Sequence, residues 1–350
     1  MGEQDVGDLE VVRRGVEAWL RERLPDGRGL RIADLAFPKA SGESSVTLLL
    51  DGEHADGRVE RFVLRMAPRA SQVFETHDLR LQVEMMDIAR AEGVPVPDVV
   101  GYEPDARRLG SDFYVMRFTE GEIPPDNPPM VFAGWVKELG AAERERMWRS
   151  GLETLAAIHR IDPAKHDVAR LPRAGAGESV VAHELRKFDS MFRPDLRASG
   201  DPRILEAWRF ALAHAPGPGP VRVCWGDSRV GNIVWRELAP VAVLDWEMAS
   251  LSCPLLDLAW WIWIDRCNSV GLGAGKLAGV PEPGEAYAQW HALTGLPIDD
   301  VAYYELLAVV RYAIVLELKF VAMRAGDAAA AALPNFAAAF LPGLVEACAR

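Results

Sequence analysis

Two aspartates and one asparagine lie at the ends of short apolar runs within residues 221–247. An apolar run leads to Asp227, Asn232 comes five residues later, and the run Val241–Leu244 ends directly before Asp245. Short apolar runs bounded by turn residues are typical of strands. Three strands arranged in this order could bring two carboxylates and one carboxamide around a single small space.

This set of side chains is the one that phosphoryl transfer requires. One carboxylate, here Asp227, would accept or orient the proton of an attacking hydroxyl group. Magnesium prefers hard oxygen ligands and bridges nucleotide phosphates, so Asn232 and Asp245 are predicted to hold it. An Asp and an Asn at this spacing can also simply cap turns. The strand context and the position of Asp245 favour a site for magnesium and a nucleotide.

The same segment resembles the phosphotransferase family that includes aminoglycoside phosphotransferases and choline and homoserine kinases. The family loop reads H-G-D-x-x-x-x-N, and a later strand ends in I/L-D-W/F-E; the stretches Trp225–Asn232 and Leu244–Glu247 match. The family's histidine is Trp225 here, which leaves the proposed base in place but leaves open how the loop is held. The resemblance implies a two-lobed, protein-kinase-like fold.

The next stretch, Leu251–Trp260, resembles the family pattern G-D-P-x-x-D-L-A-W, with Cys253 in place of its first aspartate. The resemblance implies that Asp257 braces the catalytic loop through hydrogen bonds. A second interpretation is that Asp257 only adds a favourable charge at a helix N-terminus. His159, in a match to the family's L-H-x-I-D, is expected to be structural.

Weaker resemblances lie nearer the N-terminus. Ser41–Thr47 looks like the family's phosphate-covering loop, so Ser44 is expected to bind nucleotide phosphate, although a plain polar turn would look the same. Arg65 stands where kinases carry the strand lysine that pairs with phosphates, and an exposed strand arginine is the alternative. Met116 and Phe118 fall on the strand that resembles the hinge against which adenine stacks.

The helix partner of Arg65 is left open. Glu84 has the required charge, whereas spacing to the following prolines places Gln82 in the family's glutamate position. Arginine in this setting looks usual in the branch related to acyl-CoA dehydrogenases, where hydroxylated acyl thioesters are among the acceptors.

Hydrophobic periodicity predicts the elements that must position these residues. An opening helix is expected from Leu9, then strands over 45–50 and 61–66 joined by a polar turn over 51–57, a helix over 78–92 and a strand over 113–118. Beyond these, helices are predicted over residues 143–160, 178–192, 202–214, 255–266, 284–293 and 300–324. The order describes an α+β fold, divided into an N-terminal helix (1–29), a nucleotide-binding lobe (30–116), a hinge (117–122) and a helical lobe (123–350).

Composition narrows the class of protein. The chain has 350 residues and a formal net charge of −12, which argues against a basic face for nucleic acids. Its four cysteines lack zinc-site spacing and are expected to be free thiols. The first ten residues are acidic and show no signal peptide, so the protein is predicted to be cytoplasmic and independent of membranes.

The sequence therefore predicts a magnesium-dependent kinase that moves the γ-phosphoryl group of ATP or GTP to a hydroxyl of a small molecule. An aminoglycoside, an amino alcohol and a hydroxyacyl compound are the candidate acceptors. The alternative is a nucleotide-binding pseudokinase or regulatory module, which Trp225 and Arg65 motivate. The retention of Asp227, Asn232 and Asp245 favours the enzyme. The acceptor, the choice of nucleotide and the oligomeric state stay open.

Overall fold

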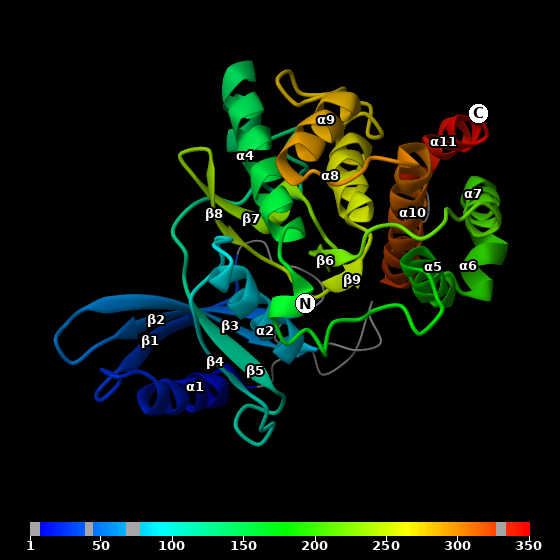
Figure 1. Ribbon diagram of the computed structural model, residues 1–350. Coiled ribbons are helices and arrows are strands. Elements are labelled where there is room, and N and C mark those ends of the chain that lie inside the picture. Colours follow the sequence, from blue (N-terminus) through cyan, green and yellow to red (C-terminus); the bar gives the residue numbers. More distant parts are fainter. Residues whose placement is uncertain (1–7, 39–44, 68–77, 327–333) are drawn as a thin grey trace. The chain divides into compact units, whose positions relative to one another are not determined.

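The computed structural model describes residues 8–38, 45–67, 78–326 and 334–350 (Figure 1). The chain divides into two compact units. Unit 1 is Met1–Glu122 together with Val241–Glu247, and unit 2 is Ile123–Pro240 together with Met248–Arg350. The short segment Val241–Glu247 thus packs with the N-terminal part of the chain. Unit 1 is built on a small antiparallel sheet and unit 2 is mainly helical, which confirms the predicted α+β class.

Unit 1 holds one five-stranded antiparallel sheet with the strand order β1-β2-β3-β5-β4. Its elements are α1 (Leu9–Arg23), β1 (Arg31–Ala36), β2 (Val46–Glu53), β3 (Val59–Met66), α2 (Leu79–Ala91), β4 (Val99–Glu103) and β5 (Phe113–Arg117). The predictions for α1, α2, β2, β3 and β5 are confirmed. No residue ranges were predicted for β1 and β4, the two edge strands of the sheet. Buried and exposed residues do not alternate regularly along either strand.

The two faces of the sheet have different neighbours. Side chains alternate along β3 and β5, so Leu64 and Val115 join the core that includes Trp19 of α1. Trp19 packs edge-on against Phe113, with ring centroids 5.3 Å apart. The alternate residues of these strands, including Arg65, therefore point to the opposite face of the sheet.

The predicted turn over 51–57 was partly wrong. The strand β2 continues to Glu53, and Asp51 and Glu53 pair with Arg61 and Val59 of β3. The burial of alternate residues extends through this polar end of the strand, so pairing with β3 overrides the turn preference of Asp and Gly. The true turn runs from His54, whose backbone N–H bonds the Arg58 carbonyl at 2.9 Å.

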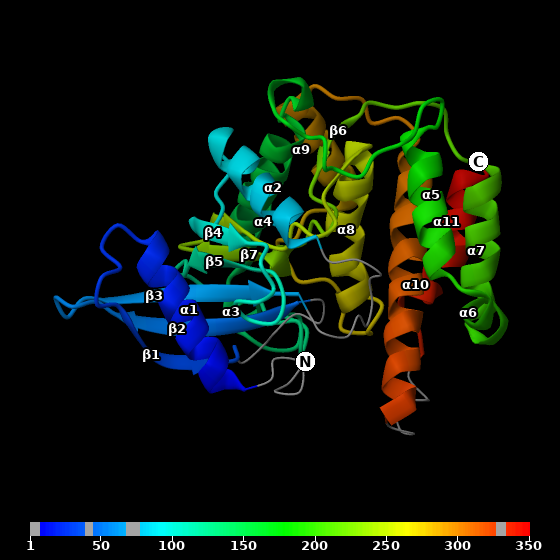
Figure 2. The ribbon, with the colours of Figure 1, turned by 90° about the horizontal axis from the view of Figure 1, so that it is seen from below.

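Unit 2 is built mainly of helices. They are α3 (Trp135–Glu138), α4 (Ala141–His159), α5 (Val180–Met191), α6 (Pro194–Ser199), α7 (Pro202–Ala213), α8 (Pro254–Ser269), α9 (Pro283–Thr294), α10 (Val301–Gly326) and α11 (Leu341–Cys348). Short elements complete it: η2 (Pro163–Lys165), β6 (Arg222–Cys224), η3 (Val230–Asn232), β7 (Ile233–Arg236), β9 (Ser250–Ser252) and η5 (Ala337–Ala339), while β8 (Ala239–Val243) leads out of unit 2 into unit 1. Figure 2 shows α5, α7 and α11 gathered along α10.

The six helices predicted for this part of the chain are all present, with ends shifted by at most three residues. Polar side chains cap the beginnings of several helices. The side chain of Ser179 accepts a hydrogen bond from the Ala182 N–H at the start of α5, and Asp201 does so from Arg203 at the start of α7. Such caps stabilise a helix by about 1 kcal/mol each. None of the described helices is both long and apolar enough to cross a membrane.

The central helix of unit 2, α8, is apolar on nearly every side. It packs against α9, α10 and β6, so almost all of its residues are buried. Trp261 of α8 reaches Gly151 in the middle of α4: a Cβ built on Gly151 would lie 2.5 Å from the Trp261 ring. This glycine is therefore required by the close approach of a large side chain.

Replacing Gly151 with alanine should destabilise the protein. The added methyl group would have to displace Trp261, and overpacking of this kind costs about 1–3 kcal/mol. Thermal or denaturant unfolding of Gly151→Ala measures the loss. Gly343→Ala is the matched control, since it also lies in a helix and no described heavy atom comes within 4 Å of its added Cβ. Equal stability of the two variants would contradict the packing argument.

Candidate active site

Asp227 lies in the loop between β6 and η3, where three side chains donate hydrogen bonds to its carboxylate. The indole N–H of Trp260 reaches Oδ1 at 2.8 Å, and Asn232 Nδ2 reaches Oδ2 at 2.7 Å. Arg229 Nε also reaches Oδ2, at 3.2 Å. The Asp227 side chain still keeps 20% of its surface exposed. The carboxylate is thus held in one orientation while a substrate can approach it.

Asn232 is bound to Asp227 twice. Its amide nitrogen donates to the Asp227 carboxylate and, at 3.0 Å, to the Asp227 backbone carbonyl. This pattern assigns the nitrogen side of the amide, so the oxygen is the atom left to meet a cation. The structure therefore brings Asp227 and Asn232 together. The amide oxygen of Asn232 is the kind of ligand that magnesium prefers, as predicted for this residue.

Arg229 and Trp260 were not predicted to contact Asp227. Besides Asp227, Arg229 binds Asp126, whose Oδ1 lies 2.6 Å from Nη1. The indole N–H of Trp260 is likewise a direct partner of the carboxylate. The sequence did single out Trp260, because it is the last residue of the D-L-A-W match. The direction of its indole ring, however, depends on how α8 packs.

Asp257 braces the catalytic loop, as the resemblance implied. Its Oδ2 accepts the backbone N–H of Trp225 at 2.6 Å, and its Oδ1 accepts that of Gly226 at 3.0 Å. The Ser228 hydroxyl adds a bond to the Asp257 carbonyl at 2.6 Å. Because the loop is held through backbone groups, these bonds do not depend on the side chain at position 225. This answers how the loop is held with tryptophan in place of histidine.

Gly226 could not be another residue. It has a φ of +93°, and a Cβ placed there would lie 2.2 Å from the Met248 carbonyl oxygen. Both the left-handed backbone and the backbone contact exclude a side chain. The glycine lets the loop pass under Met248 and aim Asp227.

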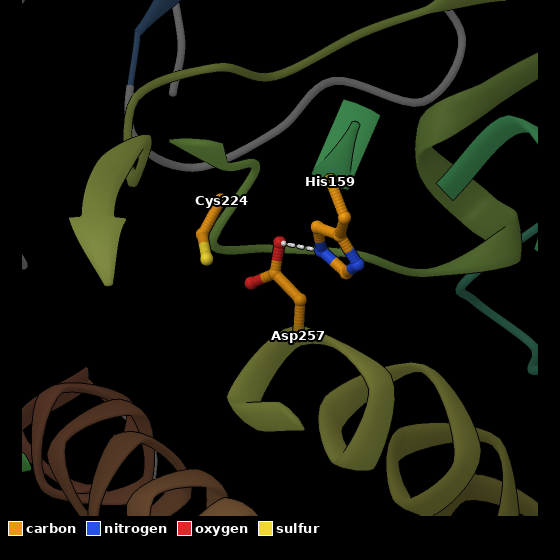
Figure 3. A group of neighbouring side chains, drawn as sticks. All are labelled: His159, Cys224 and Asp257. Atoms are coloured by element: carbon orange, nitrogen blue, oxygen red, sulfur yellow. Dashed lines mark hydrogen bonds and ion pairs between the residues drawn. The ribbon is translucent and has the colours of Figure 1, made fainter. Parts of the chain in front are cut away.

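His159, Cys224 and Asp257 form a buried cluster whose geometry resembles a metal site (Figure 3). The hydrogen bonds favour a structural role. Trp290 Nε1 donates to His159 Nδ1 at 2.9 Å, which places the ring proton on Nε2, 3.2 Å from Asp257 Oδ2. Burial also raises the pKa of the Cys224 thiol well above its usual range. The cluster therefore orients Asp257 through a neutral histidine, as predicted for His159.

In unit 1, Arg65 lies on β3 between the neighbouring strands, opposite Thr47 and Tyr114. Its Nη1 donates to Thr47 Oγ1 at 3.2 Å, and its Nη2 lies 3.8 Å from Asp245 Oδ1. Burial by itself lowers the pKa of Arg65, but Tyr114, Asp245 and Glu247 raise it above its usual range. The structure thus brings Arg65 and Asp245 together, which sequence spacing did not predict.

Of the two α2 residues considered as partners of Arg65, Gln82 lies beside Tyr114, the neighbour of Arg65 on β5. Gln82 is buried, and its Oε1 accepts a hydrogen bond from the Tyr114 hydroxyl at 3.1 Å. Burial raises the pKa of Tyr114 to about 12, so the phenol stays a neutral donor. Glu84 instead forms an ion pair with Arg80 at 2.8 Å. Arg65 is therefore linked to α2 through Tyr114 and Gln82.

Asp245 lies two residues after the end of β8 and has a left-handed backbone, with φ of +59°. The Val243 N–H bonds the Pro95 carbonyl at 2.8 Å and so anchors the preceding strand within unit 1. A non-glycine residue in this conformation costs of order 1 kcal/mol and is enriched at functional sites. The turn directs the Asp245 carboxylate toward Arg65.

Three further residues were predicted to bind the nucleotide. Met116 is buried on β5, opposite Val63 of β3. The ring of Phe118 lies 3.9 Å from the Arg61 guanidinium carbon, so one face of the ring is covered. Ser44 lies outside the described residues.

Asp257→Asn should loosen the catalytic loop. An amide in place of the carboxylate would turn an N–H group toward a backbone N–H, which leaves a buried donor unsatisfied at a cost of about 1–3 kcal/mol. Unfolding experiments measure this loss, with Asp162→Asn, an exposed helix cap, as the control. Unchanged stability of Asp257→Asn would contradict the bracing role.

Comparison with known proteins supports the same class. The model of the phosphotransferase enzyme family matches residues 38–293 of the chain. Acyl-CoA dehydrogenase family member 11 of Gallus gallus is 28% identical over 243 residues, covering 67% of this chain and 29% of that protein. The chain thus spans about 30% of the length of the curated relatives it matches. The expected likeness to the acyl-CoA-dehydrogenase-linked branch is confirmed.

Solved structures share the fold. A Ralstonia eutropha protein assigned as an aminoglycoside phosphotransferase superposes with a TM-score of 0.72 at 20% identity, covering 96% of each chain. The GDP and kanamycin complex of APH(2")-IIia superposes with a TM-score of 0.61 at 14% identity, covering 95% of this chain and 98% of that one. The kinase-like fold is confirmed, and with the match of the family model the chain belongs to the phosphotransferase enzyme family.

Proposed function

We propose that this protein transfers the γ-phosphoryl group of a nucleoside triphosphate to a hydroxyl group of a small molecule. The observation that carries the proposal is the Asp227 carboxylate, which is held by Trp260, Asn232 and Arg229 and is still partly exposed. A carboxylate fixed in this way can orient the acceptor hydroxyl and take its proton as the new bond forms.

The remaining predicted residues have complementary roles. Asn232 and Asp245 would supply oxygen ligands to magnesium, which, when bound, neutralises the phosphate charge. Arg65 would bind phosphate oxygens through its guanidinium group, which the pairing with Thr47 and Asp245 orients. Met116 and Phe118 would line the adenine or guanine site at a hinge over residues 117–122, and Ser44 would cover the phosphates.

The nucleotide is proposed by analogy with structural neighbours. One neighbour was crystallised with GDP and kanamycin, and another with AMP-PNP and hygromycin B. Those ligands are properties of those proteins, but the shared fold and the retained Asp227, Asn232 and Asp245 support a nucleotide for this chain as well. A pseudokinase would bind the nucleotide without turnover, so activity assays separate the two alternatives.

Asp227→Asn should abolish most turnover. Loss of a general base typically lowers kcat by about 100-fold to 10,000-fold. Magnesium-dependent nucleotide consumption would be measured with aminoglycosides, amino alcohols, homoserine, sugars and hydroxyacyl-CoA compounds as acceptors. Asp167→Asn is the control, because Asp167 is exposed and caps a turn. If Asp227→Asn kept wild-type turnover, Asp227 would not be the base; if the wild type bound nucleotide but turned over no acceptor, the pseudokinase alternative would be favoured.

Arg65→Met should raise the KM for the nucleotide by about tenfold or more, since a charge-assisted hydrogen bond contributes about 1.5–3 kcal/mol. Arg65→Lys keeps the charge but loses the fork of donors, so it should fall between Arg65→Met and the wild type. Steady-state kinetics at varied nucleotide concentration measure both variants, and melting temperatures show that each is folded. Equal KM values for all three proteins would remove Arg65 from the nucleotide site.

A further inference from the structure

A buried ion pair lies apart from the residues assigned above. Glu184 on α5 and Arg311 on α10 are each about 4% exposed. Arg311 Nη2 lies 3.6 Å from Glu184 Oε2, which is beyond a direct hydrogen bond. Burying two charges is costly unless further hydrogen bonds satisfy them. A pair that is close but not bonded leaves hydrogen-bonding capacity on both groups.

Arg311 is held in place by two aromatic rings. Its guanidinium carbon lies 4.5 Å from the centre of the Phe188 ring and 5.0 Å from that of Trp260. No described residue accepts a hydrogen bond from Arg311 Nε. Contact with two rings limits the movement of the guanidinium group, so it is a preorganised donor.

The pair lines a small, partly open cleft that reaches the catalytic loop. Gly226, the residue before Asp227, and Ser252 of β9 lie on the same cleft. Among the described residues, none bonds the Ser252 hydroxyl, which is buried. Trp260 connects the two sites directly, because its ring flanks Arg311 while its N–H holds Asp227.

The charge of the pair restricts what could bind to it. A ligand carboxylate would compete with Glu184 for Arg311 and leave a buried negative charge uncompensated. An ammonium group would compete with Arg311 for Glu184 and separate the pair. The second carboxylate on the cleft, Asp257, already accepts the backbone N–H groups of Trp225 and Gly226. A hydroxyl group can donate to the carboxylate and accept from the guanidinium at the same time, so it satisfies both without separating them.

We propose that Glu184 and Arg311 bind a second, non-reacting hydroxyl group of the acceptor, and that the acceptor is a neutral polyhydroxy compound. Ser252 adds a further hydroxyl partner in the cleft. The inference rests on the proposed function, because it places the acceptor beside Asp227. It narrows the substrate class to compounds such as sugars and polyols, and it disfavours acceptors that carry a charge near the reacting hydroxyl.

The test measures binding by calorimetry with the full chain and no nucleotide. The probes are glucose, galactose, mannose, ribose and myo-inositol, together with the amino-sugar and uronic-acid forms of the three hexoses. The wild type should bind at least one neutral probe, about tenfold or more tightly than its charged derivatives. Tighter binding of a charged derivative, or no binding of any neutral probe, would overturn the inference.

Two variants test the pair itself. Glu184→Gln should weaken binding of the neutral probe by about tenfold or more, through loss of a hydrogen bond to a charged group. The double variant Glu184→Gln with Arg311→Met removes both charges, so it remains informative if the single variant fails to fold. Glu317→Gln is the control. Glu317 is a buried glutamate on α10, the helix of Arg311, and it accepts a hydrogen bond from Asn335. This variant should bind the neutral probe as the wild type does.

The outcomes separate this inference from the proposed function. Unchanged binding by the folded double variant would overturn the role of the pair, whatever the kinase activity. Binding of a neutral probe that depends on Glu184, without any magnesium-dependent nucleotide consumption, would support the subsite and contradict the proposed phosphoryl transfer.

Discussion

The active-site loop depends on one buried carboxylate. Asp257, in the first turn of α8, receives the backbone N–H groups of Trp225 and Gly226, and His159 supports it from α4. A carboxylate accepts several hydrogen bonds at once, and in a buried site these are stronger than in water. Three elements far apart in the chain are thereby fixed around Asp227. The loop can vary at position 225 because the bonds that hold it come from its backbone.

The same helix supplies the loop with its second support. Trp260 lies one turn after Asp257 and donates its indole N–H to Asp227, while Arg311 stacks on its ring. A rigid helix whose sides are nearly all buried is suited to this role, since its side chains have little freedom to move. The position of Asp227 therefore follows from the packing of unit 2.

Unit 1 presents a separate cationic group. Arg65 stands where kinases carry a lysine that pairs with a glutamate. Here Tyr114 and Gln82 link the arginine to α2. The segment Val241–Glu247 packs with this unit and brings Asp245 within ion-pair distance of Arg65. The arginine thus has a fixed orientation and charge, which are the properties that binding of phosphate requires.

Much could be predicted from the sequence. Periodicity placed the main helices and three of the five sheet strands, because local pattern determines these elements. The types and spacing of Asp227, Asn232 and Asp245 indicated phosphoryl transfer. The end of β2 was misjudged, since pairing with β3 overrides local turn preference. Tertiary structure alone decided the contacts of Arg229 with Asp126, of Trp260 with Asp227 and of Arg311 with Glu184, because each joins segments whose separation in sequence carries no distance information.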